Sequence, residues 1–245
     1  PVTFTKDIAP VLFNHCTNCH RPDGNAQISL LTYDDVKRHA TQIRTVTKSR
    51  YMPPWKPEAG YGTFVGERRL TDQQVQLIER WISDGLVEGD PSDLPPQPRR
   101  AAGWQLGEPD LVVTLPEYTL RPDGSDLFRN FAVPIPGAGT RYVSAVEFRP
   151  GNRAVHHADV FVDSTAASRR LDDADPEPGY EGVISFSAHY PDGQSLGWTP
   201  GKVAAQSPKG LAWRLEAGTD FVVQLHMQPS GKPERIQPAI GLFFT

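Results

Sequence analysis

The chain has 245 residues, of which 38% are hydrophobic and 22% charged, and its formal net charge at pH 7 is −4. The length suffices for one large or two modest domains, and the composition is ordinary for a globular protein. The small net charge gives no reason to expect nucleic acid or an anionic membrane surface as a partner, and no apolar run approaches the ~18 residues of a membrane span.

Three helices are expected in the first part of the chain. The first covers residues 7–15, and the second begins at Thr32 and runs to about Thr47. The third begins with the Thr-Asp-Gln-Gln capping box of residues 71–74 and ends at Gly85. The apolar residues of this third helix recur at helical spacing and predict one buried face: Val75, Ile78, Trp81 and Ile82.

Both cysteines of the chain lie in one short run, Cys16-Thr17-Asn18-Cys19-His20. Cys-x-x-Cys-His is the attachment signature of c-type haem, because two thiols this close can add to the two vinyl groups of one porphyrin. The histidine that follows then lies under the iron as the proximal ligand. A redox dithiol would not need the histidine, and a zinc site would need two more ligands nearby. The run therefore predicts one covalent haem on Cys16 and Cys19 with His20 as an iron ligand, and an exported, periplasmic protein.

The sixth iron ligand is predicted to be Met52, which precedes Pro53 and Pro54. Proline fixes its own backbone and restrains the residue before it, so such a loop can hold a thioether over the iron. A methionine that merely fills the core is the structural alternative. His39 is the rival ligand, whereas His15 is too constrained by its neighbour Cys16 to reach the other side of the haem. A Met/His pair would suit electron transfer rather than oxygen binding.

The helix before the motif and the later helix with an inward aromatic resemble the class I cytochrome c fold. The resemblance covers residues 3–90 and implies an all-α mono-haem domain over residues 1–90. Residues 91–108 are rich in proline and are expected to be an extended, semi-rigid linker.

The pattern changes in residues 109–245, where short runs rich in β-branched and aromatic residues alternate with turn clusters. Helical periodicity is not expected here, and the acidic run Asp172–Glu177 is interpreted as a solvated loop. The pattern predicts an antiparallel β-sandwich or jelly roll of roughly eight strands, and hence an α + β protein of two domains. The expected strands are Leu111–Leu115, Phe128–Ile135, Tyr142–Phe148, Val155–Val162, Val183–Phe186, Phe221–Met227 and Ile240–Phe244.

Three histidines in this second region are candidate metal ligands. His156 and His157 are adjacent, and His226 lies in a later expected strand. Strand neighbours point to opposite faces, so the adjacent pair can meet one ion only where the strand twists, bulges or ends. Imidazoles suit copper, and three of them leave coordination positions open. Spacing alone leaves a second interpretation equally open, in which two are surface histidines and one is a satisfied core histidine.

The segments around these histidines, with Gly197-Trp198-Thr199-Pro200-Gly201 between them, resemble the N-terminal half of type II copper, ascorbate-dependent monooxygenases. Peptidylglycine and dopamine monooxygenases belong to that family. The resemblance covers residues 107–245 and implies a jelly roll whose electron-transfer copper is bound by His156, His157 and His226.

Two features depart from that family. The animal enzymes have disulfides in this half, and here both cysteines belong to the haem motif. The oxygen-activating half, with its His-x-His pair and methionine ligand, has no counterpart in these residues. Met227 is expected on the strand face opposite His226, and His189 is expected in a loop facing water, with a fourth-ligand role as the alternative.

Together the resemblances imply a periplasmic redox protein that passes single electrons between haem c and one copper ion, as the electron-delivery part of a copper monooxygenase. They imply an electron donor or acceptor protein and an oxygen-activating copper domain as partners. Two other functions stay open. One is a monooxygenase in which the cytochrome replaces ascorbate. The other is a non-catalytic haem protein whose β-sandwich docks a partner or handles copper.

Overall fold

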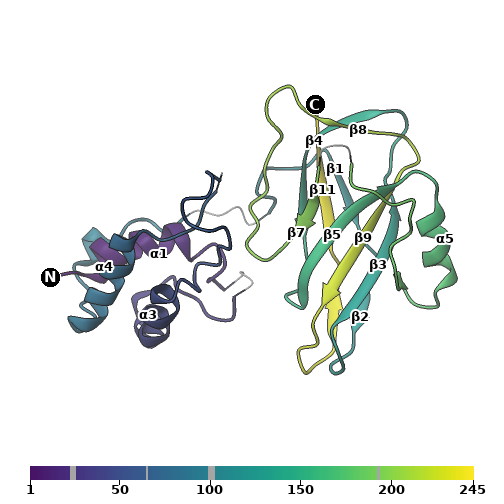
Figure 1. The fold of residues 1–245 in the computed structure, drawn as a ribbon. Helices are drawn as coiled ribbons and strands as arrows, with labels where there is room; N and C mark the ends of the chain where they lie inside the picture. Colours follow the sequence, from purple (N-terminus) through teal and green to yellow (C-terminus); the bar gives the residue numbers. More distant parts are fainter. Residues whose placement is uncertain (23–25, 65, 99–102, 192–193) are drawn as a thin grey trace. The chain divides into compact units, whose positions relative to one another are not determined.

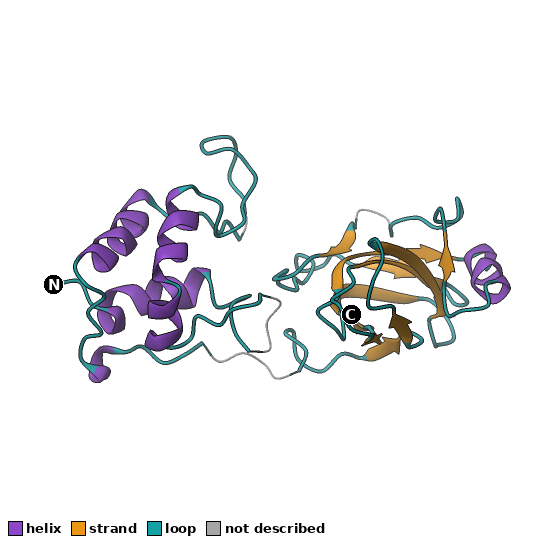
Figure 2. Cartoon of the chain, turned by 90° about the horizontal axis from the view of Figure 1, so that it is seen from below, coloured by secondary structure: helices purple, strands orange, loops and turns teal. Residues whose placement is uncertain are grey.

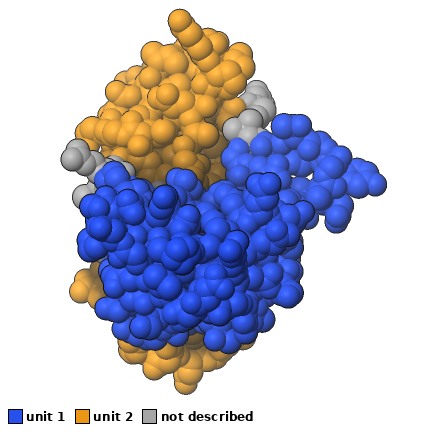
Figure 3. Space-filling model, turned by 90° about the vertical axis from the view of Figure 1, so that its left-hand side faces the viewer, with its two compact units in different colours: residues 1–99 blue, residues 100–245 orange. Residues whose placement is uncertain are grey.

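The computed structural model describes residues 1–22, 26–64, 66–98, 103–191 and 194–245. The chain divides into two compact units, Pro1–Arg99 and Arg100–Thr245 (Figure 1, Figure 3). Figure 2 shows helices in the first unit and mainly strands in the second, which makes the protein a mixed α and β fold with antiparallel sheets. The division falls within residues 91–108, the stretch expected to link two domains.

The first unit contains four α-helices, a π-helical turn and a 3-10 turn in its described residues. They are η1 (Phe4–Ile8), α1 (Ala9–His15), α2 (Tyr33–Arg38), α3 (Ala40–Lys48), α4 (Asp72–Ser83) and η2 (Pro91–Asp93). Thr71 and Gln74 form the expected capping box of α4, with N–H to oxygen distances of 3.2 and 2.8 Å. The core of this unit includes Trp81, which is 1% exposed and donates its indole N–H to the carbonyl of Val87.

The helix expected from Thr32 to Thr47 is instead two helices. His39 separates them with φ −106° and ψ 11°, and its N–H bonds to Val36 three residues back rather than four. The expectation was wrong because neither glycine nor proline marks the break, and the apolar positions on both sides of it keep one continuous helical spacing.

The second unit contains two antiparallel sheets that share one hydrophobic core. The first has the order β1-β11-β4-β8, and the second has the order β6-β3-β9-β5-β7, while β10 and β2 form a separate ribbon. The bounds are β1 (Leu111–Thr114), β2 (Tyr118–Leu120), β3 (Leu127–Pro134), β4 (Arg141–Arg149), β5 (Val155–Asp163), β6 (Tyr180–Glu181), β7 (Leu196–Trp198), β8 (Trp213–Leu215), β9 (Asp220–Met227), β10 (Glu234–Ile236) and β11 (Ala239–Phe244). Five of these strands have only two or three residues, too few for an alternating pattern to reveal them.

The residues of strand β9 alternate between the inner and outer faces of the five-stranded sheet. Its residues Phe221, Val223, Leu225 and Met227 belong to the core between the sheets. The alternate residues, among them Asp220 and His226, therefore lie on the outer face. Met227 is fully buried on the face opposite His226, as expected.

A helix that the sequence pattern did not predict covers one end of this outer face. Helix α5 (Ala167–Ala174) lies beside β3 in Figure 1, and its Arg169 forms an ion pair with the buried Asp220 at the start of β9. It includes the first part of the acidic run. The interpretation of Asp172–Glu177 as a solvated loop is therefore wrong: Asp172 accepts N–H groups of Ala132 and Gly179 at 2.7 and 3.0 Å.

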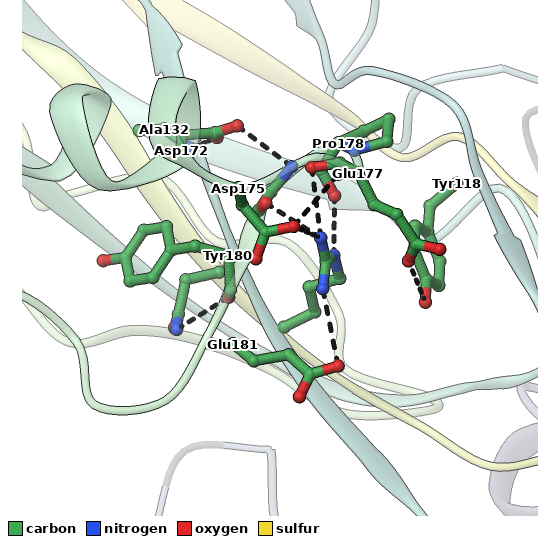
Figure 4. A network of polar contacts seen from close by, with 11 residues as sticks. Tyr118, Ala132, Asp172, Asp175, Glu177, Pro178, Tyr180 and Glu181 are labelled. Atoms are coloured by element: carbon green, nitrogen blue, oxygen red, sulfur yellow. Dashed lines mark hydrogen bonds and ion pairs between the residues drawn. The ribbon is translucent and has the colours of Figure 1, made fainter.

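The rest of the acidic run surrounds a buried cation, Arg129 of β3, which is 2% exposed. Figure 4 shows Asp175, Glu177 and Pro178 in this network of polar contacts. Its guanidinium pairs with Asp175 at 2.6 Å and donates to the carbonyls of Pro178, Glu177 and Gly179. The acidic residues thus fasten the segment between α5 and β6 to the sheet.

The strand expected over Val183–Phe186 is absent. Gly182 has φ +102°, which ends β6, and Val183 and Phe186 are 80% and 103% exposed. The run has the composition of a strand, but β6 ends at Glu181 and no strand of the described residues pairs with 183–186.

Candidate functional site

An irregularity in β5 brings the adjacent histidines to one side of the sheet. Val155 pairs with Met227 and His157 pairs with His226, so His156 is an extra residue in a β-bulge. A bulge leaves one residue unpaired and redirects its side chain. This is the distortion that two neighbouring histidines need in order to face one ion.

The three imidazoles converge through the same ring atom. Nδ1 of His156 lies 3.2 Å from Nδ1 of His226 and 3.4 Å from Nδ1 of His157, and the third separation is 3.2 Å. A point equidistant from three atoms so spaced lies about 1.9 Å from each, close to the ~2.0–2.1 Å of a metal–imidazole bond. Within the described residues, these three histidines are the group whose donor atoms could hold a metal ion.

Neighbouring side chains orient His226 in particular. Its Nε2 lies 2.9 Å from Oδ2 of Asp126, and the same oxygen accepts from the side-chain amide of Gln228 at 3.0 Å. Phe128, which pairs with His226 across β3 and β9, stacks on the imidazole with centroids 4.2 Å apart and planes 5° apart. His226 is consequently held from two directions.

The cluster lies at the accessible end of the outer face. His226 is 8% exposed, His157 is half-buried and His156 is exposed. Burial and the nearby charge of His226 lower the pKa of His157, which favours the neutral imidazole that binds metals. Hydrogen bonds from Gln228 and His226 lower the pKa of the Asp126 carboxyl.

The other histidine of the second unit is not part of the cluster. His189 is exposed and its Nδ1 lies 3.1 Å from the carbonyl oxygen of Ser187, while its backbone pairs with Val162. The expectation of a loop histidine facing water agrees with this placement.

The Cys-x-x-Cys-His run of residues 16–20 forms a single turn directly after α1. The N–H of Cys16 bonds to Leu12, and the N–H groups of Cys19 and His20 both bond to the carbonyl of Cys16. The two thiols and the histidine therefore project from one turn of chain. Burial, together with the charge of Cys19, raises the pKa of the Cys16 thiol to about 12.

His20 has the orientation that an iron ligand needs. Its Nδ1 lies 3.2 Å from the carbonyl oxygen of Ile28, which can only accept, so Nδ1 carries the proton. Nε2 then keeps its lone pair for a metal. Burial lowers the pKa of His20, and the charge of His39 lowers it further although the Ile28 bond opposes both. The donor set fits c-type haem.

The residues predicted as the sixth ligand of a haem iron, or as rivals for that position, lie in different places. Met52 follows α3, is half-buried, and donates its N–H to Val46 at 2.9 Å. His39 lies at the break between α2 and α3 and is near enough to His20 to affect its pKa. His15 is held by the side-chain amide of Gln74 at 3.2 Å. Met52 as the sixth ligand stays a prediction of the sequence.

Sequence reasoning missed the supporting residues Asp126, Phe128, Gln228 and Ile28. The first three are two residues apart from one another or from His226, so alternation places them on the same face. That signal becomes readable only when the register of β3 against β9 is known.

Comparison of the chain with protein-family models, curated proteins and solved structures finds no match in any of the three. In the described part of the chain, no helix has both the length and the apolar character needed to cross a membrane.

Proposed function

We propose that this chain is an exported redox protein that passes single electrons between a covalent haem and a copper ion. Cys16 and Cys19 would carry the haem with His20 and Met52 as iron ligands, and His156, His157 and His226 would hold the copper. The observation that carries the proposal is the convergence of three imidazole Nδ1 atoms within 3.2–3.4 Å. Each bound group would supply one-electron redox chemistry.

We also propose a specific fold for each of the two units. The first unit would be a class I cytochrome c, supported by α1 leading into the Cys-x-x-Cys-His turn and by Trp81 on the inward face of α4. The second unit would be a jelly roll like the N-terminal half of the copper monooxygenases, supported by its two antiparallel sheets around one core.

The ligand set favours copper over structural zinc. Structural zinc sites have four protein ligands, whereas the described cluster offers three imidazoles. Asp126 does not provide the fourth, because it contacts Nε2 of His226, the ring nitrogen remote from the three converging Nδ1 atoms. Three nitrogens with open positions suit copper, and the His cluster exposes one edge to solvent through His156.

Electron delivery is favoured over oxygen activation because the described residues contain one such cluster, and the family's oxygen chemistry uses a second copper. An oxygen-activating copper domain and an electron donor or acceptor protein are the partners proposed for it.

The first test is a copper titration monitored by electron paramagnetic resonance. We expect one tightly bound copper with nitrogen couplings, and at least a tenfold weaker affinity in His226→Ala. His189→Ala is the matched control, because it removes an exposed histidine of the same unit that lies outside the cluster. A copper affinity that is unchanged in His226→Ala, or that falls equally in His189→Ala, would contradict the copper site and leave the second unit as a docking module.

The second test addresses the electron transfer itself. The protein would be expressed with c-type haem maturation factors, its haem reduced, and one equivalent of copper(II) added. We expect the haem absorbance to change from the iron(II) to the iron(III) form as the copper(II) resonance disappears, at a rate independent of protein concentration. Persistence of both signals, or a rate proportional to concentration, would contradict transfer within one chain.

A further inference from the structure

Asp126 lies beside the histidine cluster without facing into it. It immediately precedes β3, where Leu127 pairs with Met227 of β9, so Asp126 and Gln228 leave the sheet side by side. Its Oδ2 accepts from Nε2 of His226 at 2.9 Å and from the side-chain amide of Gln228 at 3.0 Å. Gln228 is in turn held by its N–H, which bonds to the carbonyl of Ala154 at 2.8 Å.

The contact determines which nitrogen of His226 is protonated. Oδ2 of Asp126 accepts the side-chain N–H of Gln228 at 3.0 Å, so it presents lone pairs to Nε2 of His226 2.9 Å away. Nε2 of His226 must therefore carry the hydrogen, and Nδ1 must carry the lone pair. Nδ1 is the atom that forms one corner of the triangle of imidazole nitrogens.

The ring is also fixed in rotation. Phe128 stacks against one face of His226 with its plane 5° from parallel, and the Asp126 bond holds the edge of the ring remote from the cluster. Rotating the imidazole to present Nε2 to the metal would break the carboxylate bond. Tautomer and orientation are thus set by the same contact.

We propose that Asp126, oriented by Gln228, is a positioning residue for the metal bound by His156, His157 and His226. It preorganises Nδ1 of His226 as a ligand, and its negative charge stabilises the more highly charged state of the metal, which lowers the reduction potential. The inference rests on the proposed function, since it concerns the copper of the same site. Partners of this kind typically change metal affinity by about 10–100-fold when removed.

The test compares Asp126→Ala with Asp123→Ala. Both variants remove one carboxylate from the turn before β3, but Asp123 is exposed and lies outside the contacts of the His226 ring. In the metal-free protein, two-bond proton–nitrogen spectra report the tautomer of His226 directly. Titration with copper(II) then gives the affinity, and redox titration gives the potential.

We expect the wild type and Asp123→Ala to show His226 protonated at Nε2. Asp126→Ala should show a mixture of tautomers, a 10–100-fold weaker copper affinity and a higher reduction potential, with unchanged circular dichroism. A purely structural role for Asp126 would leave tautomer and potential unchanged.

The two proposals fail in different ways. A wild type that binds no copper overturns the proposed function. Retention of the Nε2–H tautomer in Asp126→Ala, or equal copper affinity in the two variants, overturns the role of Asp126 even if wild-type copper binding is tight.

Discussion

His20 and His226 each have one ring nitrogen hydrogen-bonded to an oxygen and the other available to a metal, but the available nitrogen differs between them. His20 ties Nδ1 to the carbonyl oxygen of Ile28 and leaves Nε2 free, whereas His226 ties Nε2 to Asp126 and leaves Nδ1 free. In both cases an oxygen that can only accept selects the tautomer. The choice of nitrogen follows from where the acceptor lies, on a following loop for His20 and on a neighbouring strand for His226.

The proposed sixth ligand of the haem can be tested by paired substitutions. We expect Met52→Ala to abolish the methionine-to-iron charge-transfer absorption of the oxidised protein and to lower the reduction potential, because a thioether ligand favours iron(II). His39→Ala should leave that absorption in place. The absorption spectrum and a redox titration check both, and the reverse pattern would assign the ligand to His39.

A buried carboxylate makes the second unit sensitive to acid. Burial of Asp163 opposes ionisation, but hydrogen bonds from the side chains and N–H groups of Thr165 and Ser168 outweigh it and hold its pKa well below the usual range. Ser187 donates to the same carboxylate, and Asp220, paired with Arg169, faces it across the strands. The folded-state pKa is thus below the unfolded one, so the ionised group stabilises the protein at neutral pH and loses this effect as the pH falls.

We therefore expect Asp163→Asn to lower the free energy of unfolding at pH 7 by about 1–3 kcal/mol. The difference from wild type should shrink between about pH 5 and pH 2, as the carboxyl of the unfolded chain becomes protonated. Urea denaturation at several pH values measures it, with Asp173→Asn on the exposed face of α5 as the control. A difference that is constant with pH would contradict the assignment.

At the scale of residues, the sequence predicts what depends on covalent spacing. The run from Cys16 to His20 specifies its own geometry, because all its members lie in one turn. The convergence of His156, His157 and His226 could be stated only as a condition, because it needed a bulge whose position no residue type marks. The role of Asp126 was out of reach without the register of β3.

At the scale of elements, we expect the bulge in β5 to be needed for bringing the three histidines together and not for pairing the strands of the sheet. Val155 and His157 keep regular partners on either side of it, Met227 and His226. Removing the extra residue would restore uninterrupted antiparallel pairing with the same inward and outward faces.

Deleting His156 should therefore leave a folded unit whose melting temperature is within a few degrees of wild type. Its copper affinity should fall at least as far as that of His156→Ala, which retains the bulge. Thermal unfolding and copper titration of the two variants test this. Loss of the folded state on deletion would show that the bulge is needed by the sheet itself.

The elements that sequence patterns revealed are those with repeated spacing. Helix α4 shows its capping box and its buried face, and the long strands β3, β4, β5 and β9 show runs of β-branched residues. Helix α5 was missed because its eight residues include few apolar ones, and its attachment to the sheet depends on charged side chains such as Arg169 and Asp172. Patterns of hydrophobicity do not record such contacts.

At the scale of the whole molecule, each unit has a core of its own. The first is built around Trp81 and the helices, and the second around the inward residues of the two sheets. The second unit, Arg100–Thr245, contains no cysteine, and a chain of this length can bury enough apolar surface to fold without disulfides. The division into two units could be anticipated because composition changes abruptly across residues 91–108.

A fragment of residues 103–245 should fold alone. We expect one cooperative unfolding transition in urea and a copper affinity within about twofold of the full chain, because the site and the groups that orient it all belong to this unit. Gradual unfolding, or a fragment that binds no copper while the full chain does, would show that the first unit contributes to the site.

Because the three histidines lie on the outer face, a metal ion can bind to them after the unit has folded. The inward residues of β9 are buried between the sheets, while the imidazoles lie at the end of the strand away from α5, and His156 reaches solvent. Whatever ion they bind can enter and leave through that edge without opening the core. A chelator should strip such a site and leave the fold intact, and a carrier that meets the finished protein could refill it.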